Sequence, residues 1–395
     1  MHHRLGFPPP SLREDNIMSQ PIISNPTISR RSFLLGSGAV ALGGPALLAA
    51  CGSSSSSASG KGGSVSIATW VLYIEDDKKP TSGPTLSSFT KDTGIKVNYK
   101  TAVDDNNDFT EKSKGLLAKK QGIGYDVVVL TSWMVSRWIK NGWTQPFDVA
   151  NIPNKKNLKA AYATPSFDPT RAQSLPFAIG QVGIGYYPTK TGFEVKSVKD
   201  LLDPRLKGRV TLLTEVRDCV GLFMLANGDD PSKPNLDAAK KAIAEIGKAR
   251  DGGQFRAIKG NSYTEDLGLG DVYAAVAWSG DIAALSKEHP DLKWVLPADG
   301  AMSFIDTFLI PIGAKNKANG EKLINHFYDP AISGPLFESI QYVSPVEGAD
   351  AKMSAAAASN PLINPAAGAK IYEFADLSEA DADELDKAYT DATKL

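Results

Sequence analysis

The chain has 395 residues, of which 42% are hydrophobic and 22% charged, the balance of an ordinary globular protein with a large core. Once the four arginines and two acids of residues 1–50 are set aside, 39 basic and 42 acidic residues remain, a net charge of −3. This composition excludes nucleic acid as an expected partner, because nucleic-acid-binding domains carry a basic excess. At this length we expect two domains of typical size.

Residues 1–50 have the features of an export leader and are left out of the expected fold. The hexapeptide SRRSFL at residues 29–34 is a twin-arginine export signal. The apolar stretch 34–50 contains glycines and ends in small residues, which is typical of a signal peptide and not of a membrane span. Residues 1–17 show no apolar periodicity, which leaves both Met1 and Met18 open as the start of the chain.

The leader ends in the tetrapeptide LAAC at residues 48–51, which resembles the lipobox of bacterial lipoproteins. The resemblance implies cleavage before Cys51 and a lipid on that cysteine; a plain secretory signal is the alternative. The Gly/Ser-rich segment that follows, up to residue 63, predicts a flexible tether. We therefore predict a protein exported by the twin-arginine pathway and lipid-anchored on the extracytoplasmic, or periplasmic, face of the cell membrane.

The first half of the remaining chain alternates strands and helices. This βαβαβα order predicts an α/β fold with a mostly parallel sheet flanked by helices and right-handed crossovers. Ligands of such sheets bind beyond the carboxyl ends of the strands. The expected strands are 65–70, 95–99 and 125–130, and the expected helices are 86–93, ending at Gly94, 108–119, opened by an Asp108 capping box, and one that Ser132 caps and Gly142 ends.

The second half repeats this alternation and adds two stretches of another kind. Residues 176–187 and 304–313 are long, apolar and glycine-containing without a helical period, and we interpret them as strands that cross between two lobes. Gly180, Gly183 and Gly185 would give such a hinge its backbone freedom, although bulged central strands are the alternative. The other expected elements are strands at 209–213, 272–278 and 294–297, helices at 216–226, 236–249 and 281–289, and helical structure from 319 through an Ala-rich tail to Leu395.

The residues that usually carry enzymatic chemistry are scarce. The histidines after residue 50, His289 and His326, both lie in expected helices and are interpreted as structural. Cys219 lies among apolar helical residues with no thiolate-stabilising partner nearby, which predicts a buried structural cysteine, and no internal disulfide remains once Cys51 carries lipid. Nucleophile, zinc and nucleotide-binding motifs are not found after residue 51, so we expect no catalytic residue, metal or cofactor.

Acids and aromatic rings instead gather at the ends of the expected strands. Glu215 and Asp218 flank Arg217 where a strand turns into a helix, and a cationic ligand needs acids at a helix N-terminus to reverse its local field. Arg217 opens an alternative, because a guanidinium can hold the carboxylate of an amino acid or organic anion, but we favour an internal ion pair with a neighbouring acid. The rings at strand ends or turns are Trp70, Tyr73, Trp133, Trp278, Phe304 and Tyr342.

The ordered series TWVLYI, YDVVVLTSW, LPFAIGQVGIGYY, LKGRVTLLTEVRD, VAWSG, FIDTFLIP and IQYVSP resembles the spermidine/putrescine-binding proteins of bacterial ABC importers across nearly all of residues 64–350. The resemblance implies a two-lobed periplasmic-binding-protein (Venus-flytrap) fold with strand hinges between the lobes. It also implies that the protein acts as a monomer with permease subunits as partners. We expect lobe 1 to comprise residues 64–180 and 306–350, and lobe 2 residues 181–305 and 351–395.

The resemblance also carries over individual site residues. It places Trp70, Tyr73, Trp278 and Tyr342 in aromatic walls and Asp306 as the central carboxylate. The chain departs from the family's usual residues at several positions, and it has no clear counterpart of the family's last polar contact near the C-terminus. The departures are Thr131 for Ser, Trp133 for Tyr, Asp218 for Glu beside the matching Glu215, and Phe304 where polyamine binders carry Trp.

These residues suit a polyamine, since rings cover methylene groups and attract ammonium groups while carboxylates fix the charged ends. Glu75, Asp76 and Asp77 follow the first rings, and we expect some of them to make the mouth of the cleft negative. The length of the polyamine stays open. The alternatives are a binding protein for an amino acid, organic anion or sugar, or an exported carbohydrate-active enzyme that uses Glu215 with Asp218 or Asp306.

Overall fold

The computed structural model describes residues 62–233, 235–361, 369–375 and 377–394. The predicted export signal, the lipobox and most of the tether fall within residues 1–61 and lie outside the described residues. Across the ranges just given, no helix is both long enough and apolar enough to cross a membrane.

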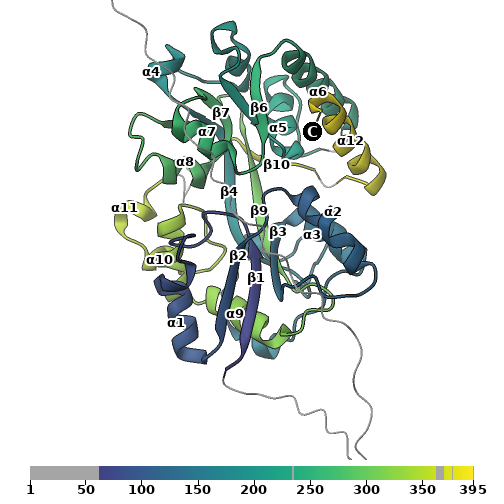
Figure 1. Ribbon diagram of the computed structural model, residues 1–395, viewed down its shortest axis with the longest axis vertical. Coiled ribbons are helices and arrows are strands. Elements are labelled where there is room, and N and C mark those ends of the chain that lie inside the picture. The colour runs from purple at the N-terminus through teal and green to yellow at the C-terminus, as the bar shows by residue number, and fades with distance from the viewer. Residues whose placement is uncertain (1–61, 234, 362–368, 376, 395) are drawn as a thin grey trace, which may run out of the picture. The chain divides into compact units, whose positions relative to one another are not determined.

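The first half of the described chain forms the predicted alternation of strands and helices (Figure 1). The first strand lies between the next two and pairs with both in parallel, which confirms the predicted parallel sheet. Gly94 ends the first helix with a left-handed φ of 73°, as its position after Thr93 predicted. The elements are β1 (Ser64–Thr69), α1 (Pro84–Thr93), β2 (Lys96–Thr101), α2 (Asn106–Leu117), β3 (Val127–Thr131) and α3 (Ser132–Lys140).

Two predicted helix caps are wrong. The side chain of Asp105 accepts a hydrogen bond from the backbone N–H of Asp108 at 3.0 Å, so α2 begins before the expected capping box. Asp105 and Asp108 carry the same side chain, and each has an acidic residue three positions later. The sequence pattern of a helix cap therefore fits both residues. Ser132 does not cap α3, because its hydroxyl donates to the carbonyl of Ile305 at 2.9 Å.

Two central strands join the first half of the sheet to the second. They are β4 (Leu175–Tyr186) and β9 (Ala301–Leu309), which pair antiparallel with each other. β9 also pairs with β3 through its last residues, whereas β4 pairs through its last residues with β7 (Ala274–Trp278). Figure 1 shows both strands running between the two groups of helices. This is the predicted arrangement of two α/β lobes joined by crossing strands, while the lobe boundaries remain a prediction.

The glycines of β4 provide room for neighbouring groups. A Cβ atom on Gly180 would lie 2.1 Å from Cζ of Phe304, and one on Gly185 would lie 2.3 Å from Cδ1 of Ile282. Neither glycine, nor Gly183 between them, has a positive φ. Close approach of side chains therefore explains these glycines in the folded protein, and their role as a hinge stays a prediction.

The second lobe contains elements that the sequence did not predict: the one-turn helix α4 (Pro188–Thr191), β6 (Phe255–Lys259) and α7 (Tyr263–Leu269). β6 lies at the end of the sheet order β2-β1-β3-β9-β4-β7-β5-β6, and most of its residues are only partly buried, so it lacks the apolar pattern of the central strands. The other elements here are β5 (Val210–Leu213), α5 (Val216–Ala226), α6 (Leu236–Asp251), α8 (Ser279–Leu285) and β8 (Lys293–Val295).

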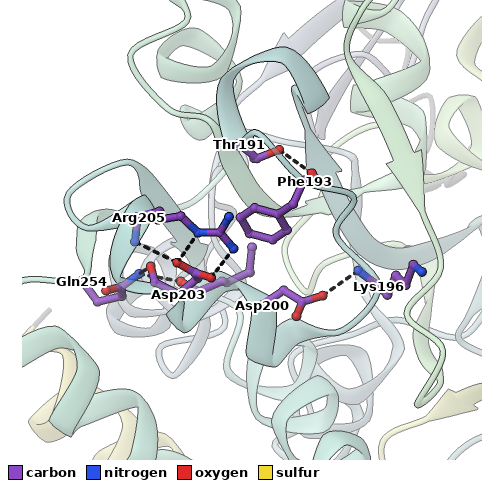
Figure 2. Close-up of polar contacts among 8 residues, drawn as sticks. Thr191, Phe193, Lys196, Asp200, Asp203, Arg205 and Gln254 are labelled. Atoms are coloured by element: carbon purple, nitrogen blue, oxygen red, sulfur yellow. Dashed lines mark hydrogen bonds and ion pairs between the residues drawn. The ribbon is translucent and has the colours of Figure 1, made fainter.

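The connection from β4 to β5 is fixed by polar contacts (Figure 2). The guanidinium of Arg205 donates twice to the Asp203 carboxylate, at 2.9 and 2.6 Å, and lies 4.2 Å from the ring centre of Phe193. The side chain of Gln254 donates to the Asp203 carbonyl at 3.0 Å. These contacts anchor the segment that leads into β5, whose carboxyl end carries predicted site residues.

The predicted helical tail is wrong over one segment. Residues 371–373 form a strand, β10 (Ile371–Glu373), that adds in parallel to the first residues of β9. The sequence Ile-Tyr-Glu-Phe at 371–374 is too short to show the alternation of apolar and polar residues that predicts a strand. It forms a strand because the first residues of β9 have a free edge with which it can pair. The helices of this part are α9 (Lys317–Phe327), α10 (Pro330–Ile340), α11 (Ala355–Ala358) and α12 (Glu379–Thr393), the last packed against α6 (Figure 1).

Candidate ligand-binding site

A cavity of about 90 Å³ lies where the carboxyl ends of β1, β3, β5, β6 and β7 meet the crossing strand β9. This is the edge at which parallel sheets bind ligands, as the sequence predicted. The cavity wall contains every residue that was predicted to contact a ligand: Trp70, Tyr73, Thr131, Trp133, Glu215, Asp218, Trp278, Phe304, Asp306 and Tyr342. Further wall residues that the prediction did not include are Ser132, Arg217, Asn261, Met302, Ser303, Ile305, Glu373 and Phe374.

Five rings follow one another around the cavity. Trp70 contacts Trp278 with ring centres 6.3 Å apart, and Trp278 contacts Phe304 at 6.4 Å. The series continues from Phe304 to Tyr342 at 6.1 Å and from Tyr342 to Tyr73 at 5.2 Å. All four contacts are edge to face, the arrangement that aromatic pairs favour. Through these contacts the five rings form one continuous wall along the cavity.

Asp306 is the most enclosed acid in this wall, with 2% of its surface exposed. One of its carboxylate oxygens accepts a hydrogen bond from the Tyr73 hydroxyl, and the other accepts one from the Thr131 hydroxyl at 2.7 Å. Burial raises the pKa of Asp306 to about 6, although both hydrogen bonds oppose the rise. The two hydrogen bonds therefore fix the orientation of the Asp306 carboxylate. A cation bound beside it would stabilise its ionised form.

The acids at the start of α5 have different surroundings. Asp218 accepts a hydrogen bond from the indole N–H of Trp278 at 2.8 Å, and burial raises its pKa to about 7. Glu215 accepts from the backbone N–H and the side-chain amide of Asn106, at 3.1 and 2.8 Å. Asn106 belongs to α2 in the first lobe, so Glu215 also joins the two lobes beside the cavity, a role that the sequence did not predict.

Asp281, at the start of α8, is a further buried acid behind the aromatic wall. It accepts hydrogen bonds from the hydroxyls of Tyr263, at 3.0 Å, and Tyr342, at 3.5 Å, and from the Asn261 amide at 3.3 Å. Burial raises its pKa to about 7. Asp281 lies three residues after Trp278, in the first turn of α8. Acids at this place commonly stabilise the helix dipole, so the sequence alone does not mark Asp281 as a site residue.

The acids after β1 shape their own loop and are not among the residues that line the cavity, and their contribution to a negative mouth stays a prediction. Glu75 accepts from the backbone N–H of Thr85 at 3.0 Å, and Asp76 accepts from that of Lys78 at 2.8 Å. Asp77 accepts from the N–H of Leu72, a residue with a left-handed φ of 59°. Short-range hydrogen bonds of this kind are common in turns, and here they present the two rings at 70 and 73.

Arg217 has an internal partner, as predicted, but that partner is not a neighbour in the sequence. Its guanidinium lies 3.3 Å from the carboxylate of Asp386 on α12 and 3.7 Å from the ring centre of Trp133. Arg217 therefore does not present a free cation to the cavity.

The remaining candidates for chemistry are structural. Cys219 is fully buried, its sulfur contacts the backbone of Leu213, and burial raises the pKa of the thiol to about 12. This confirms the predicted buried cysteine. Neither His289 nor His326 lines the cavity. No group of His, Cys, Asp and Glu that could hold a metal ion occurs within the described part of the chain.

Comparison with known proteins assigns the family. The family described as bacterial extracellular solute-binding protein matches residues 85–365. A putrescine-binding periplasmic protein of Pseudomonas aeruginosa is 31% identical over 335 residues, which cover 78% of this chain and 86% of that protein. A spermidine/putrescine-binding periplasmic protein of Haemophilus influenzae is 28% identical over 285 residues, covering 72% and 75%.

Among solved structures, that of a putative spermidine/putrescine ABC transporter from Listeria monocytogenes superimposes with a TM-score of 0.72 at 24% identity. It covers 83% of this chain and 98% of its own. At this identity the likeness concerns the fold, and it confirms the predicted two-lobed periplasmic-binding-protein architecture. Together with the match over most of the chain, these findings show that the protein belongs to the bacterial extracellular solute-binding protein family.

Proposed function

We propose that the protein captures a polyamine, such as putrescine or spermidine, between its two lobes by hinge closure and delivers it to the permease of an ABC importer. The observation that carries the proposal is the pair of buried acids in a ring-lined cavity. Asp306 and Asp218 accept hydrogen bonds from hydroxyl and indole groups, which are uncharged, so a cation between them would supply the missing charge. The names of the relatives support the same class of ligand.

Both parts of a polyamine, its methylene chain and its ammonium groups, match groups in this wall. Its methylene chain can lie against the five rings, and each ammonium over a ring face adds about 0.5–2 kcal/mol when water is excluded. Its ammonium groups can each donate to a carboxylate at one end of the cavity.

We further propose an extracytoplasmic location, which agrees with the periplasmic relatives. In this proposal the twin-arginine signal at residues 29–34 directs export, a lipid on Cys51 anchors the monomer to the membrane, and the Gly/Ser tether lets it reach the permease. The sequence features of the leader and tether are what support these finer steps.

The alternatives gain less support from the site. An organic anion or amino acid would need the guanidinium of Arg217, which is held by Asp386. A carbohydrate-active enzyme would use Glu215, Asp218 and Asp306 as acid and base. However, Asn106, Trp278 and Tyr73 already donate to these carboxylates, and the relatives bear the names of polyamine-binding proteins.

Calorimetric titration of the purified protein tests the proposed function. We expect saturable heat with putrescine or spermidine and none with an amino acid or a sugar. No heat with any di- or triamine, together with a response to one of the other solutes, would replace the proposal with the alternative.

The raised pKa values predict opposite effects of pH on the empty and the loaded protein. Because the folded-state pKa values of Asp306 and Asp218, about 6 and about 7, exceed the unfolded value, their contribution to stability is present at acidic pH and lost as pH rises through them. A bound diamine needs the ionised carboxylates, so its affinity should rise by up to about tenfold per pH unit for each proton released.

Melting temperatures between about pH 5 and pH 8, measured with and without putrescine, check this prediction. The increase in melting temperature that putrescine produces should grow with pH. In the empty protein, ionisation of these acids should lower the melting temperature as pH rises. A putrescine-induced shift that stays constant over this range would show that neither carboxylate has to lose a proton for binding.

A further inference from the structure

The position of Arg217 raises a question if the ligand is a dication. Its side chain, 8% exposed, forms part of the cavity wall beside Glu215 and Asp218. A guanidinium is always charged, so an unpaired one at this place would repel ammonium groups and attract a carboxylate. Something in the fold has to cancel its charge for the cavity to accept a polyamine.

The cancelling charge comes from the C-terminal helix α12. One oxygen of the Asp386 carboxylate lies 3.3 Å from Nη1 of Arg217, and the other lies 2.9 Å from Nη2 of Arg137 on α3. Asp386 thus bridges two guanidinium groups that come from different lobes. Its side chain is only 16% exposed, so water screens these pairs weakly.

Trp133 completes the cluster. Arg217 lies over its ring at 3.7 Å from the centre, and Arg137 lies at 5.2 Å. Trp133 and Arg217 also line a second cavity of about 550 Å³, so the stacked pair forms a partition between the two spaces. Asp386 therefore contacts Arg217 while the guanidinium lies over the indole ring.

Other charged groups near Arg217 do not replace Asp386. Glu215 and Asp218 attract it, but Glu215 already accepts two hydrogen bonds from Asn106, and Asp218 accepts one from Trp278. Asp383, one turn earlier on α12, lies 3.6 Å from Arg137 and is 69% exposed. Arg137 itself repels Arg217. The pairing with Asp386 is therefore the contact that decides the charge of this wall.

We propose that Asp386 is a specificity-determining residue: by neutralising Arg217 and holding it on Trp133, it makes the cavity accept an ammonium group where a carboxylate would otherwise bind. The inference rests on the proposed function and names a residue that acts through Arg217, outside the ring-and-acid set. It predicts a change of ligand class when the Asp386 charge is removed. The matching probe is 4-aminobutanoate, which has the four carbons of putrescine but carries a carboxylate in place of one terminal aminomethyl group.

The test titrates putrescine and 4-aminobutanoate into the wild-type protein and four variants. Asp386→Asn should lower putrescine affinity by roughly tenfold or more, as expected for breaking a largely buried charge pair, and should gain measurable binding of 4-aminobutanoate. Asp386→Glu should retain the wild-type preference. Asp383→Asn, the matched control on the same helix, should change neither affinity.

The double variant Asp386→Asn with Arg217→Gln separates charge from packing. Both charges are gone, so putrescine affinity should return to within about threefold of wild type and 4-aminobutanoate should not bind. A merely structural role of Asp386 predicts no recovery. If Asp386→Asn does not fold, Asp386→Ser, which removes the same charge with a smaller side chain and keeps Arg217, is judged by the same two affinities.

Two results would overturn the inference: Asp386→Asn with wild-type affinity for putrescine, or with no gain for 4-aminobutanoate. A double variant that binds putrescine as poorly as the single variant would also overturn it. Failure of the wild-type protein to bind putrescine would instead count against the proposed function. The two outcomes can be told apart, because the gain of 4-aminobutanoate binding is measured on the Asp386→Asn variant in a separate titration.

Discussion

Replacing Asp306 with asparagine should lower the affinity for putrescine by roughly tenfold or more, because a hydrogen bond to a charged partner in a dry site contributes about 1.5–3 kcal/mol. Asparagine has nearly the same shape and keeps an oxygen for the hydroxyls of Tyr73 or Thr131 to bond. The change therefore removes the charge and leaves the wall in place. Calorimetric titration measures the loss.

Stability separates loss of the ligand contact from loss of the fold. Burial raises the pKa of Asp306 to about 6, so above that pH its ionised form destabilises the empty protein. Asp306→Asn should then melt at a higher temperature than wild type near about pH 8, even though it binds putrescine less well. Asp76→Asn, an exposed acid in the loop after β1, is the control and should alter neither property. Unchanged putrescine affinity in Asp306→Asn would remove Asp306 from the site.

Replacing Gly180 with alanine should push the Phe304 ring of the wall into the cavity and reduce the space for a ligand. The new methyl group would lie 2.1 Å from Cζ and 2.5 Å from Cε1 of Phe304, far inside contact distance. Gly180 and Phe304 face each other on paired strands, so the ring has to move toward the cavity. We expect a loss of putrescine affinity of roughly tenfold or more and a destabilisation of about 1–3 kcal/mol from overpacking.

Two further variants make this result specific. A Cβ atom on Gly115 in α2 meets nothing within 4 Å, so Gly115→Ala should leave binding intact and stabilise the protein by about 0.5–1 kcal/mol. Combining Gly180→Ala with the smaller side chain of Phe304→Leu should recover part of the lost affinity. Wild-type affinity in Gly180→Ala alone would show that the Phe304 ring can move without entering the site.

The sequence predicted the elements that have strong local patterns. Buried strands such as β3 read as continuous apolar runs, and α5 was predicted at its observed ends because a strand, a turn and an apolar helix follow directly. The sequence does not predict β6 and β10, since most residues of both are only partly buried or exposed. Their pairing is decided by the free edges of β5 and β9, which a local pattern does not contain.

The same distinction applies to the site. The ten predicted residues meet at one cavity because most of them follow strands that end at one edge of the sheet, where the interior of β9 adds Phe304 and Asp306. What the sequence missed are contacts between distant segments. Asn106 and Glu215 are 109 residues apart, and Arg217 and Asp386 are 169 apart. Such pairs leave no spacing pattern, so the joining of lobes at Glu215 and the neutralisation of Arg217 required the folded structure.

The central claim is that two buried carboxylates and a ring-lined wall together hold a ligand with two ammonium groups. Parallel calorimetric titrations with putrescine and with 1-aminobutane, which lacks the second ammonium, test it most directly. Putrescine should bind tighter by roughly tenfold or more, since one charge-assisted contact is lost with each ammonium. Equal affinities for the two amines, or no binding of either, would contradict the claim.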